Sequence, residues 1–123
     1  MGQPVVHWEM WSKEPQKVSD FYQKAFGWTV KHLPEMNYWL ADTGGKGGIN
    51  GGIMKPQEGP WPGNLCLYID VPTLGPAIEK VKQAGGKVVV EKREVPGVGK
   101  FALFADPDGR VMGIWEQQPQ PPK

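Results

Sequence analysis

An imidazole and a carboxylate stand two residues apart in a short, mostly apolar segment near the start of the chain. Residues 5–11 alternate as a β-strand does, so His7 and Glu9 share one face with Trp11. The opposite face is apolar and is expected to lie against a helix. A carboxylate beside an imidazole can keep it charged and oriented, as in an acid–base pair. The plainer interpretation is that Glu9 accepts hydrogen bonds from a backbone or side-chain donor.

A second group of candidate residues lies in the second half of the chain. Asn64, Cys66 and Tyr68 alternate along one predicted strand, and Gly113 and Trp115 along another. Aromatic surface with a few converging polar groups is the usual composition of a small-molecule site. Cys66 could act as a nucleophile, but no base is identifiable beside it, and buried cysteines usually behave as small apolar groups. The sequence therefore predicts a binding face formed by Trp11, Asn64, Cys66, Tyr68, Gly113 and Trp115.

The elements that must position these residues occur twice. Residues 4–54 and 64–116 each contain a short strand, an amphipathic helix closed by glycine and three further strands. The two helices end at Gly27 and Gly85, which are equivalent positions. An internal repeat of about 50 to 60 residues constrains the fold strongly. It predicts an α+β fold of two β-α-β-β-β modules, with a curved, incompletely closed mixed sheet, helices outside and a cleft between the modules.

Caps, periodicity and turn residues give the expected boundaries. The first helix has Ser12 as N-cap and Pro15 in its first turn, and the second helix has Thr73 as N-cap. The stripe expected to be buried on the first helix consists of Val18, Phe21, Tyr22, Ala25 and Phe26. Strands are expected at 5–11, 28–33, 38–41, 49–54, 65–71, 87–91, 100–105 and 111–116. A Pro- and Gly-rich linker is expected at 55–63 and a disordered tail at 117–123.

Composition and charge exclude several classes of function. The chain has 123 residues, 39% of them hydrophobic and 22% charged, which is typical of one globular domain spanning 1–123. A net charge of +1 provides no broad basic surface for nucleic acid or an anionic membrane. No segment approaches the roughly 18 apolar residues of a membrane span, and the N-terminus lacks the pattern of a signal peptide. The single Cys66 allows no intrachain disulfide, and we expect a cytoplasmic protein.

Two short motifs resemble those of one known family. The segment Phe21-Tyr22-x-x-x-Phe26-Gly27-Trp28 resembles the first helix-to-strand junction of the vicinal-oxygen-chelate superfamily, which includes glyoxalase I, bleomycin-resistance proteins and extradiol dioxygenases. The segment 106–109, Asp-Pro-Asp-Gly, resembles the turn before the last strand of that family. The repeated module is also the family's fold, so the resemblance covers nearly the whole chain. It implies a homodimer, in some members with modules exchanged between subunits.

Catalytic members of that family hold a divalent metal with four side chains. The resemblance places these positions at His7, Asn64, Gly113 and, by the symmetry of the modules, Gly52 or thereabouts. One imidazole, one amide and two glycines cannot hold a first-row ion tightly, because a tight site needs three or four N, O or S donors. Glu116 lies three residues beyond Gly113, so strand alternation turns it to the opposite face. We therefore expect no metal or other cofactor, with a divalent metal held through His7 as the alternative.

Two classes of function remain open. The missing metal ligands favour a binding module that holds a small, partly aromatic molecule in the cleft, as the resemblance to bleomycin-resistance proteins implies. The pair His7 and Glu9 keeps an enzyme possible: a lyase, isomerase or dioxygenase that uses these two residues, with or without a divalent metal. The identity of the ligand or substrate does not follow from the sequence.

Overall fold

The computed structural model describes residues 2–55 and 65–118. Its contacts divide the chain into two compact units: a first unit of residues 6–67, and a second unit of residues 68–123 together with 1–5. Residues 56–63 of the expected linker, Asn64 and residues 119–123 of the expected tail lie outside the described residues.

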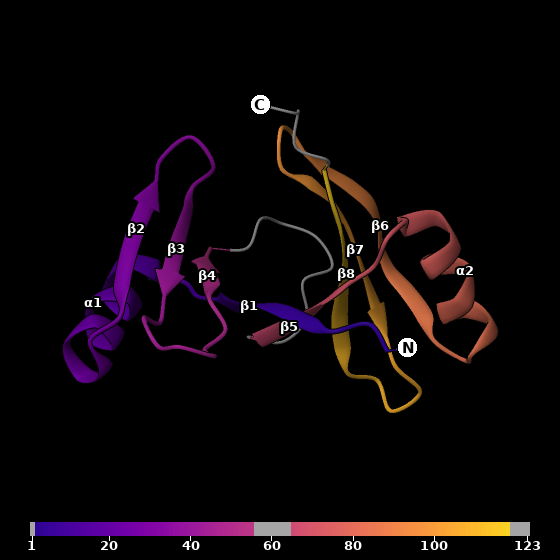
Figure 1. The fold of residues 1–123 in the computed structure, drawn as a ribbon, viewed down its shortest axis with the longest axis horizontal. Coiled ribbons are helices and arrows are strands. Elements are labelled where there is room, and N and C mark those ends of the chain that lie inside the picture. Colours follow the sequence, from indigo (N-terminus) through magenta and orange to yellow (C-terminus); the bar gives the residue numbers. More distant parts are fainter. Residues whose placement is uncertain (1, 56–64, 119–123) are drawn as a thin grey trace. The chain divides into compact units, whose positions relative to one another are not determined.

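The first module contains β1 (Val5–Trp11), α1 (Pro15–Phe26), β2 (Thr29–Leu33), β3 (Tyr38–Asp42) and β4 (Gly51–Met54). Its strands follow the order β2-β3-β4-β1, in which β1 is parallel to β4 and the other pairs are antiparallel. Helix α1 packs beside β2, β3 and β4 (Figure 1).

The second module contains β5 (Leu65–Asp70), α2 (Leu74–Gln83), β6 (Lys87–Val95), β7 (Gly99–Ala105) and β8 (Val111–Gln117). Its order is β5-β8-β7-β6, again with one parallel pair, β5 and β8, and with α2 beside β6, β7 and β8. The expected α+β class of two β-α-β-β-β modules with a mixed, unclosed sheet is confirmed. Among the described residues, no helix is long and apolar enough to cross a membrane.

Several strand boundaries differ from the expected ones. Strand β6 continues to Val95 because its hairpin with β7 pairs as far as Val95 with Gly99, across two register shifts. Strand β8 includes Gln117, which pairs with Gly99, and the Gln118 N–H donates to the Val98 carbonyl over 2.9 Å. The prediction that disorder begins at residue 117 is therefore wrong, since Gln117 belongs to a paired strand.

Helix α1 begins and ends largely as the sequence indicates. Pro15 occupies its first position, and Gly27 ends it in the left-handed conformation with φ of 73°. Ser12 is not the N-cap: that position is Glu14, and the Ser12 hydroxyl accepts the Glu14 N–H one step earlier, over 3.0 Å. The sheet-facing side of the helix is also different, because the buried residues are Pro15 and Ser19, one turn apart.

The stripe that was expected to be buried on α1 is therefore mostly at the surface. Phe21 is 58% exposed and Phe26 is 64% exposed. Tyr22 stacks on Trp28 with ring centroids 4.7 Å apart, and Trp28 lies 5.4 Å from Trp8. These contacts place Trp8 on the helix side of the sheet as expected, although its ring is half-buried at the flank of α1 rather than in the core.

Helix α2 is capped by a residue far away in the sequence. The Thr73 side chain makes no capping hydrogen bond; instead the Leu74 N–H donates to Glu116 Oε1 over 2.7 Å. Leu74 also belongs to the helix-side core with Val71, Ala102 and Ile114. Glu116 therefore faces the helix, which confirms that it lies on the other side of β8 from Gly113.

Candidate functional site

A chain of hydrogen bonds joins four side chains on the face of the first module that is turned away from α1. His7 Nε2 lies 2.9 Å from the Tyr38 hydroxyl, which donates to Glu9 Oε2 over 2.9 Å. The indole N–H of Trp11 donates to the other oxygen, Glu9 Oε1, over 2.7 Å. Glu9 and Trp11 are buried and His7 is half-buried. The expectation that the Glu9 carboxylate accepts side-chain hydrogen bonds is thus met by two donors.

A glycine in the strand between Tyr38 and Glu9 makes this chain possible. In the register of the sheet, Gly52 of β4 stands opposite Glu9 of β1 on one side and Leu40 of β3 on the other. A Cβ added at Gly52 would overlap the Tyr38 hydroxyl and ring. The phenol therefore lies across the bare backbone of β4 and reaches the polar residues of β1. This is the close approach that a glycine within a strand commonly indicates.

Burial and the Glu9 carboxylate determine whether Tyr38 and His7 are protonated. Burial, followed by the negative charge of Glu9, raises the pKa of Tyr38 far above its ordinary value of 10.0, so the phenol keeps its proton. Burial lowers the pKa of His7 and outweighs the opposing effect of Glu9. The imidazole is therefore neutral at neutral pH, unlike in the acid–base alternative, in which Glu9 would keep it charged.

This shift predicts a pH dependence of stability. The folded protein resists protonation of His7, whereas the unfolded chain accepts the proton near 6.5. The resulting stabilisation is complete above that value and is lost as pH falls towards the lower, folded pKa. We expect the free energy of unfolding, measured by denaturant titration, to decline between about pH 7 and pH 5. His7→Gln should flatten this slope, and an unchanged slope in that variant would contradict the assignment.

The second module repeats the pairing of a glycine with a tyrosine ring. Gly113 of β8 stands opposite Tyr68 of β5, and a Cβ at Gly113 would overlap the Tyr68 ring. Tyr68 also packs edge-on against Phe101, with ring centroids 6.2 Å apart. The indole N–H of Trp115 donates to Gln117 Oε1 over 3.0 Å. Because Ile114 faces the α2 core, Gly113 and Trp115 lie on the face turned away from that helix, as expected.

The register of the two modules shows which positions are equivalent. Glu9 stands opposite Gly52, and Tyr68 stands opposite Gly113, each six residues before the first residue of its helix. Counting back two residues makes Cys66, rather than Asn64, the equivalent of His7. Cys66 is buried and its thiol lies 3.7 Å from the Leu67 carbonyl oxygen.

The residues at the family's metal positions do not fit a metal. No group of three or more His, Cys, Asp and Glu side chains that could hold an ion exists within residues 2–55 and 65–118. At both glycine positions, moreover, the space that a ligand side chain would need is taken by a tyrosine ring. The donor set and the packing lead to the same conclusion. Asn64 lies outside the described residues and stays a prediction.

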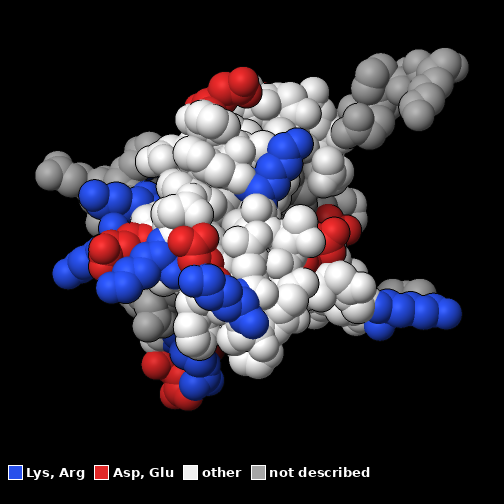
Figure 2. All heavy atoms as spheres, turned by 90° about the vertical axis from the view of Figure 1, so that its left-hand side faces the viewer, with Lys and Arg blue, Asp and Glu red and all other residues white. Residues whose placement is uncertain are grey.

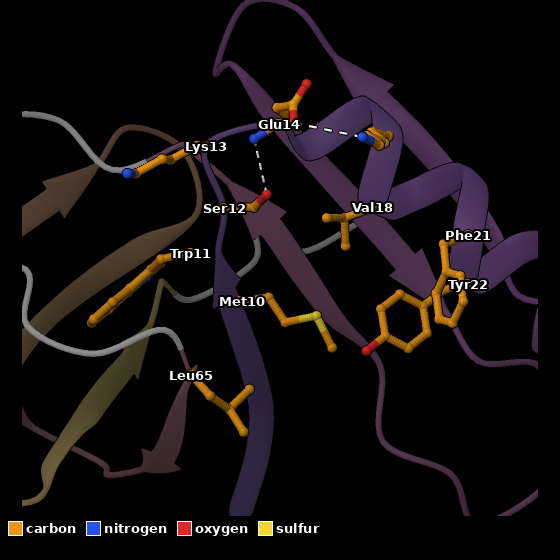
Figure 3. A pocket seen from close by; sticks show the side chains of 10 residues that line it. Met10, Trp11, Ser12, Lys13, Glu14, Val18, Phe21, Tyr22 and Leu65 are labelled. Atoms are coloured by element: carbon orange, nitrogen blue, oxygen red, sulfur yellow. Dashed lines mark hydrogen bonds and ion pairs between the residues drawn. The ribbon is translucent and has the colours of Figure 1, made fainter.

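A separate groove of about 770 Å³ lies in the first unit beside the end of β1 and α1. Figure 3 shows Met10, Val18 and Tyr22 on one side of β1, while Trp11 extends to the other side. Lys13, Glu14 and Lys17 also line it. Of the residues predicted to bind a ligand, this groove includes Trp11 alone, so it is a different feature from the hydrogen-bonded face.

Tyr38 is the residue that the sequence reasoning missed. It was assigned only to a strand, because no nearby motif marks it as polar or functional. The signal that could have revealed it is the Gly51-Gly52 pair in an otherwise apolar strand. Two glycines there indicate that other groups approach the backbone closely, and the structure shows Trp8 against Gly51 and Tyr38 against Gly52.

Comparison with known proteins gives a consistent result. The family model "Glyoxalase/Bleomycin resistance protein/Dioxygenase superfamily" matches residues 5–112. The chain is 28% identical over 115 residues to "Putative glyoxylase CFP32" of Mycobacterium bovis, covering 91% of this chain and 43% of that protein. It is 28% identical over 114 residues to "Anthracycline biosynthesis protein DnrV" of Streptomyces peucetius, covering 80% of this chain and 42% of that protein. The chain thus spans less than half the length of the curated relatives it matches.

Solved structures share the fold. The crystal structure of the hypothetical protein BH1468 from Bacillus halodurans superposes with a TM-score of 0.71 over 100% of both chains, at 16% sequence identity. An identity this low shows a common fold and carries no information on ligand or reaction.

Proposed function

Because this chain belongs to the glyoxalase, bleomycin-resistance and dioxygenase superfamily, we propose that it binds a small, flat, partly aromatic molecule without a complete metal site. The single observation that carries this proposal is the hydrogen-bonded group of His7, Tyr38, Glu9 and Trp11. It combines aromatic surface with polar groups whose positions are fixed before any ligand arrives. The name of the anthracycline-biosynthesis relative is compatible with an aromatic ligand.

Within this proposal each predicted residue has a role. In the first module His7 and Glu9 orient the ligand beside the ring of Trp11, which is 6% exposed. In the second module Trp115 supplies aromatic surface, with Cys66, Tyr68 and Gly113 on the same face of the sheet. Asn64, outside the described residues, completes the predicted set. An aromatic pair contributes about 0.5 to 1.5 kcal/mol beyond area burial, so loss of one ring should weaken binding by at least about two- to tenfold.

Tryptophan fluorescence tests this proposal, because two of the six tryptophans belong to the proposed set. The probes are flat aromatic compounds: an anthracycline, a naphthoquinone and a coumarin. We expect saturable quenching by at least one of them, weakened in Trp115→Ala and retained in Trp28→Ala, whose ring packs on Tyr22 beside α1. Absence of binding to every probe by both fluorescence and calorimetry would count against a site for aromatic molecules.

A second candidate function is proton transfer by a metal-independent lyase or isomerase. The observation that favours it is the lowered pKa of His7 beside a phenol and a carboxylate, since perturbed groups concentrate at functional sites. A dioxygenase or another metal-dependent enzyme is disfavoured, because the donor set does not fit an ion. In an active enzyme Tyr38→Phe should change kcat and its pH profile, whereas a pure binding protein should show no turnover of any bound compound.

We also propose that the chain forms a homodimer through the exposed aromatic side of α1. Phe21 and Phe26 are more than half exposed there. Figure 2 shows uncharged surface between the Lys, Arg, Asp and Glu side chains on one side of the molecule. Lys17 lies 4.0 Å from Glu14, the N-cap residue of α1, so the start of the helix carries both signs of charge beside the exposed aromatic rings and can pair with its own copy. The sequence contains one cysteine, Cys66, so no intrachain disulfide can form; this is compatible with the cytoplasm, which we propose as the location.

Sedimentation tests the dimer. At micromolar concentration we expect a species of twice 13.6 kDa. Phe21→Glu and Phe26→Glu should convert it to the monomer, whereas Met36→Glu, at a residue 47% exposed in the β2–β3 turn, should not. A wild-type protein that sediments only as a 13.6 kDa species would contradict the proposal.

A further inference from the structure

We propose that Tyr38 and Gly52 act as a matched pair that replaces a metal ligand and holds His7 as the tautomer with its proton on Nε2. Tyr38 is a positioning residue in this proposal, because it acts on the molecule through His7. The inference is independent of which ligand the protein binds, since it concerns the polar group before any ligand is present.

Tyr38 fills the space beside Gly52. A side chain at position 52 would enter the space between β3 and β1, but the Tyr38 hydroxyl and ring already occupy that space. The hydroxyl lies within hydrogen-bond distance of both His7 Nε2 and Glu9 Oε2, at 2.9 Å from each. The phenol thus lies where a carboxylate on β4 would approach the imidazole.

The single proton of the Tyr38 phenol determines which nitrogen of His7 is protonated. At neutral pH a phenol has one proton, and Tyr38 donates it to Glu9. The phenol oxygen can then take part in the contact with His7 only as an acceptor. His7 Nε2 must therefore carry a hydrogen and donate it. Glu9 also accepts the indole N–H of Trp11, so every hydrogen bond in this group is donated in the direction of the Glu9 carboxylate.

The consequence is a block against cations at the Nε2 atom of His7. A nitrogen that carries a proton has no lone pair for a metal, so an ion at Nε2 would have to remove that proton and displace the phenol. The pairing of Tyr68 with Gly113 shows that the second module fills its equivalent position with a tyrosine ring as well. Each module thus excludes a ligand side chain with a tyrosine ring, which comes from β3 in the first module and from β5 in the second.

Nuclear magnetic resonance of ¹⁵N-labelled histidine tests the proposal, because the chain has only two histidines. His32→Gln identifies the signals of His7, and it is a suitable reference because His32 stacks on Trp39 at 4.1 Å, away from the network. We expect wild-type His7 as the Nε2–H tautomer. Tyr38→Phe keeps the ring against Gly52 but removes this acceptor, so the population of the Nε2–H tautomer should fall.

The second arm adds equimolar Zn²⁺ to the wild-type protein, and His7 Nε2 should keep the signal of a protonated nitrogen. Three results would each overturn the proposal: His7 as the Nδ1–H tautomer in the wild type, an unchanged tautomer population in folded Tyr38→Phe, or loss of the Nε2 proton of wild-type His7 when Zn²⁺ is added. If Tyr38→Phe fails to fold, the tautomer of His7 in the wild-type protein and its response to Zn²⁺ still test the proposal. No ligand is present in either arm, so failure of the proposed binding function would be seen separately, in the fluorescence titration.

Discussion

Gly52→Ala is expected to lower the free energy of unfolding by about 3 kcal/mol, an effect at the upper end of overpacking in a protein core. The added methyl group would overlap the Tyr38 hydroxyl and ring, and it would do so between two paired strands. The backbone cannot move away without loss of the ladder hydrogen bonds to β1 or β3. Denaturant titration with circular dichroism measures the change.

Two further variants separate this clash from the general cost of replacing a glycine with alanine. Tyr38→Ala opens the space, so Gly52→Ala should cost much less in that background, and the two substitutions should be strongly non-additive. Gly45→Ala is the matched control in the same unit, because a Cβ there meets nothing within 4 Å. Additive effects in the double variant would show that Tyr38 does not fill the space at Gly52.

Glu9→Ala should have the second large effect, about 3 kcal/mol of lost stability. Its carboxylate accepts from the Trp11 indole and the Tyr38 hydroxyl, and its removal leaves two donors without these acceptors in a buried place. A buried polar group that loses its partner costs about 1 to 3 kcal/mol, and more where a charge is involved. Thermal unfolding and the near-ultraviolet circular dichroism of tryptophan should report the change together.

The control for Glu9 is Glu35→Ala, at an exposed residue of the β2–β3 turn. That substitution should change stability by no more than about 0.5 kcal/mol. Equal, small effects of the two variants would mean that Glu9 is solvated rather than the centre of a buried network.

The fold could be predicted because repetition, helix-ending glycines and strand alternation act locally. Gly27 adopts the left-handed conformation that was expected, and the DPDG segment turns as expected, with Gly109 at φ of 89°. The faces of β1 and β8 also followed from alternation, which put His7, Glu9 and Trp115 on the sides turned away from the helices. The family resemblance, which relied on these short motifs, is confirmed by the match over residues 5–112.

The remaining features depend on contacts between distant residues, which local patterns do not contain. Glu116 caps α2 across 42 positions of sequence, where Thr73 was expected to do so. Tyr38 and Glu9 are 29 positions apart, and only the pairing of β3, β4 and β1 brings them together. The aromatic residues of α1 follow helical periodicity, but periodicity alone does not reveal which of two apolar sides packs on the sheet.

Elemental analysis of the untagged, purified protein tests the central claim most directly, namely that the hydrogen-bonded group works without a divalent metal. We expect far less than one equivalent of Ni, Zn, Fe or Mn per chain, because the residues at the family's metal positions do not fit an ion. His7 donates its Nε2–H to Tyr38, and tyrosine rings fill the space at Gly52 and Gly113. About one equivalent of a single metal, retained on dialysis and lost in His7→Ala, would contradict this account.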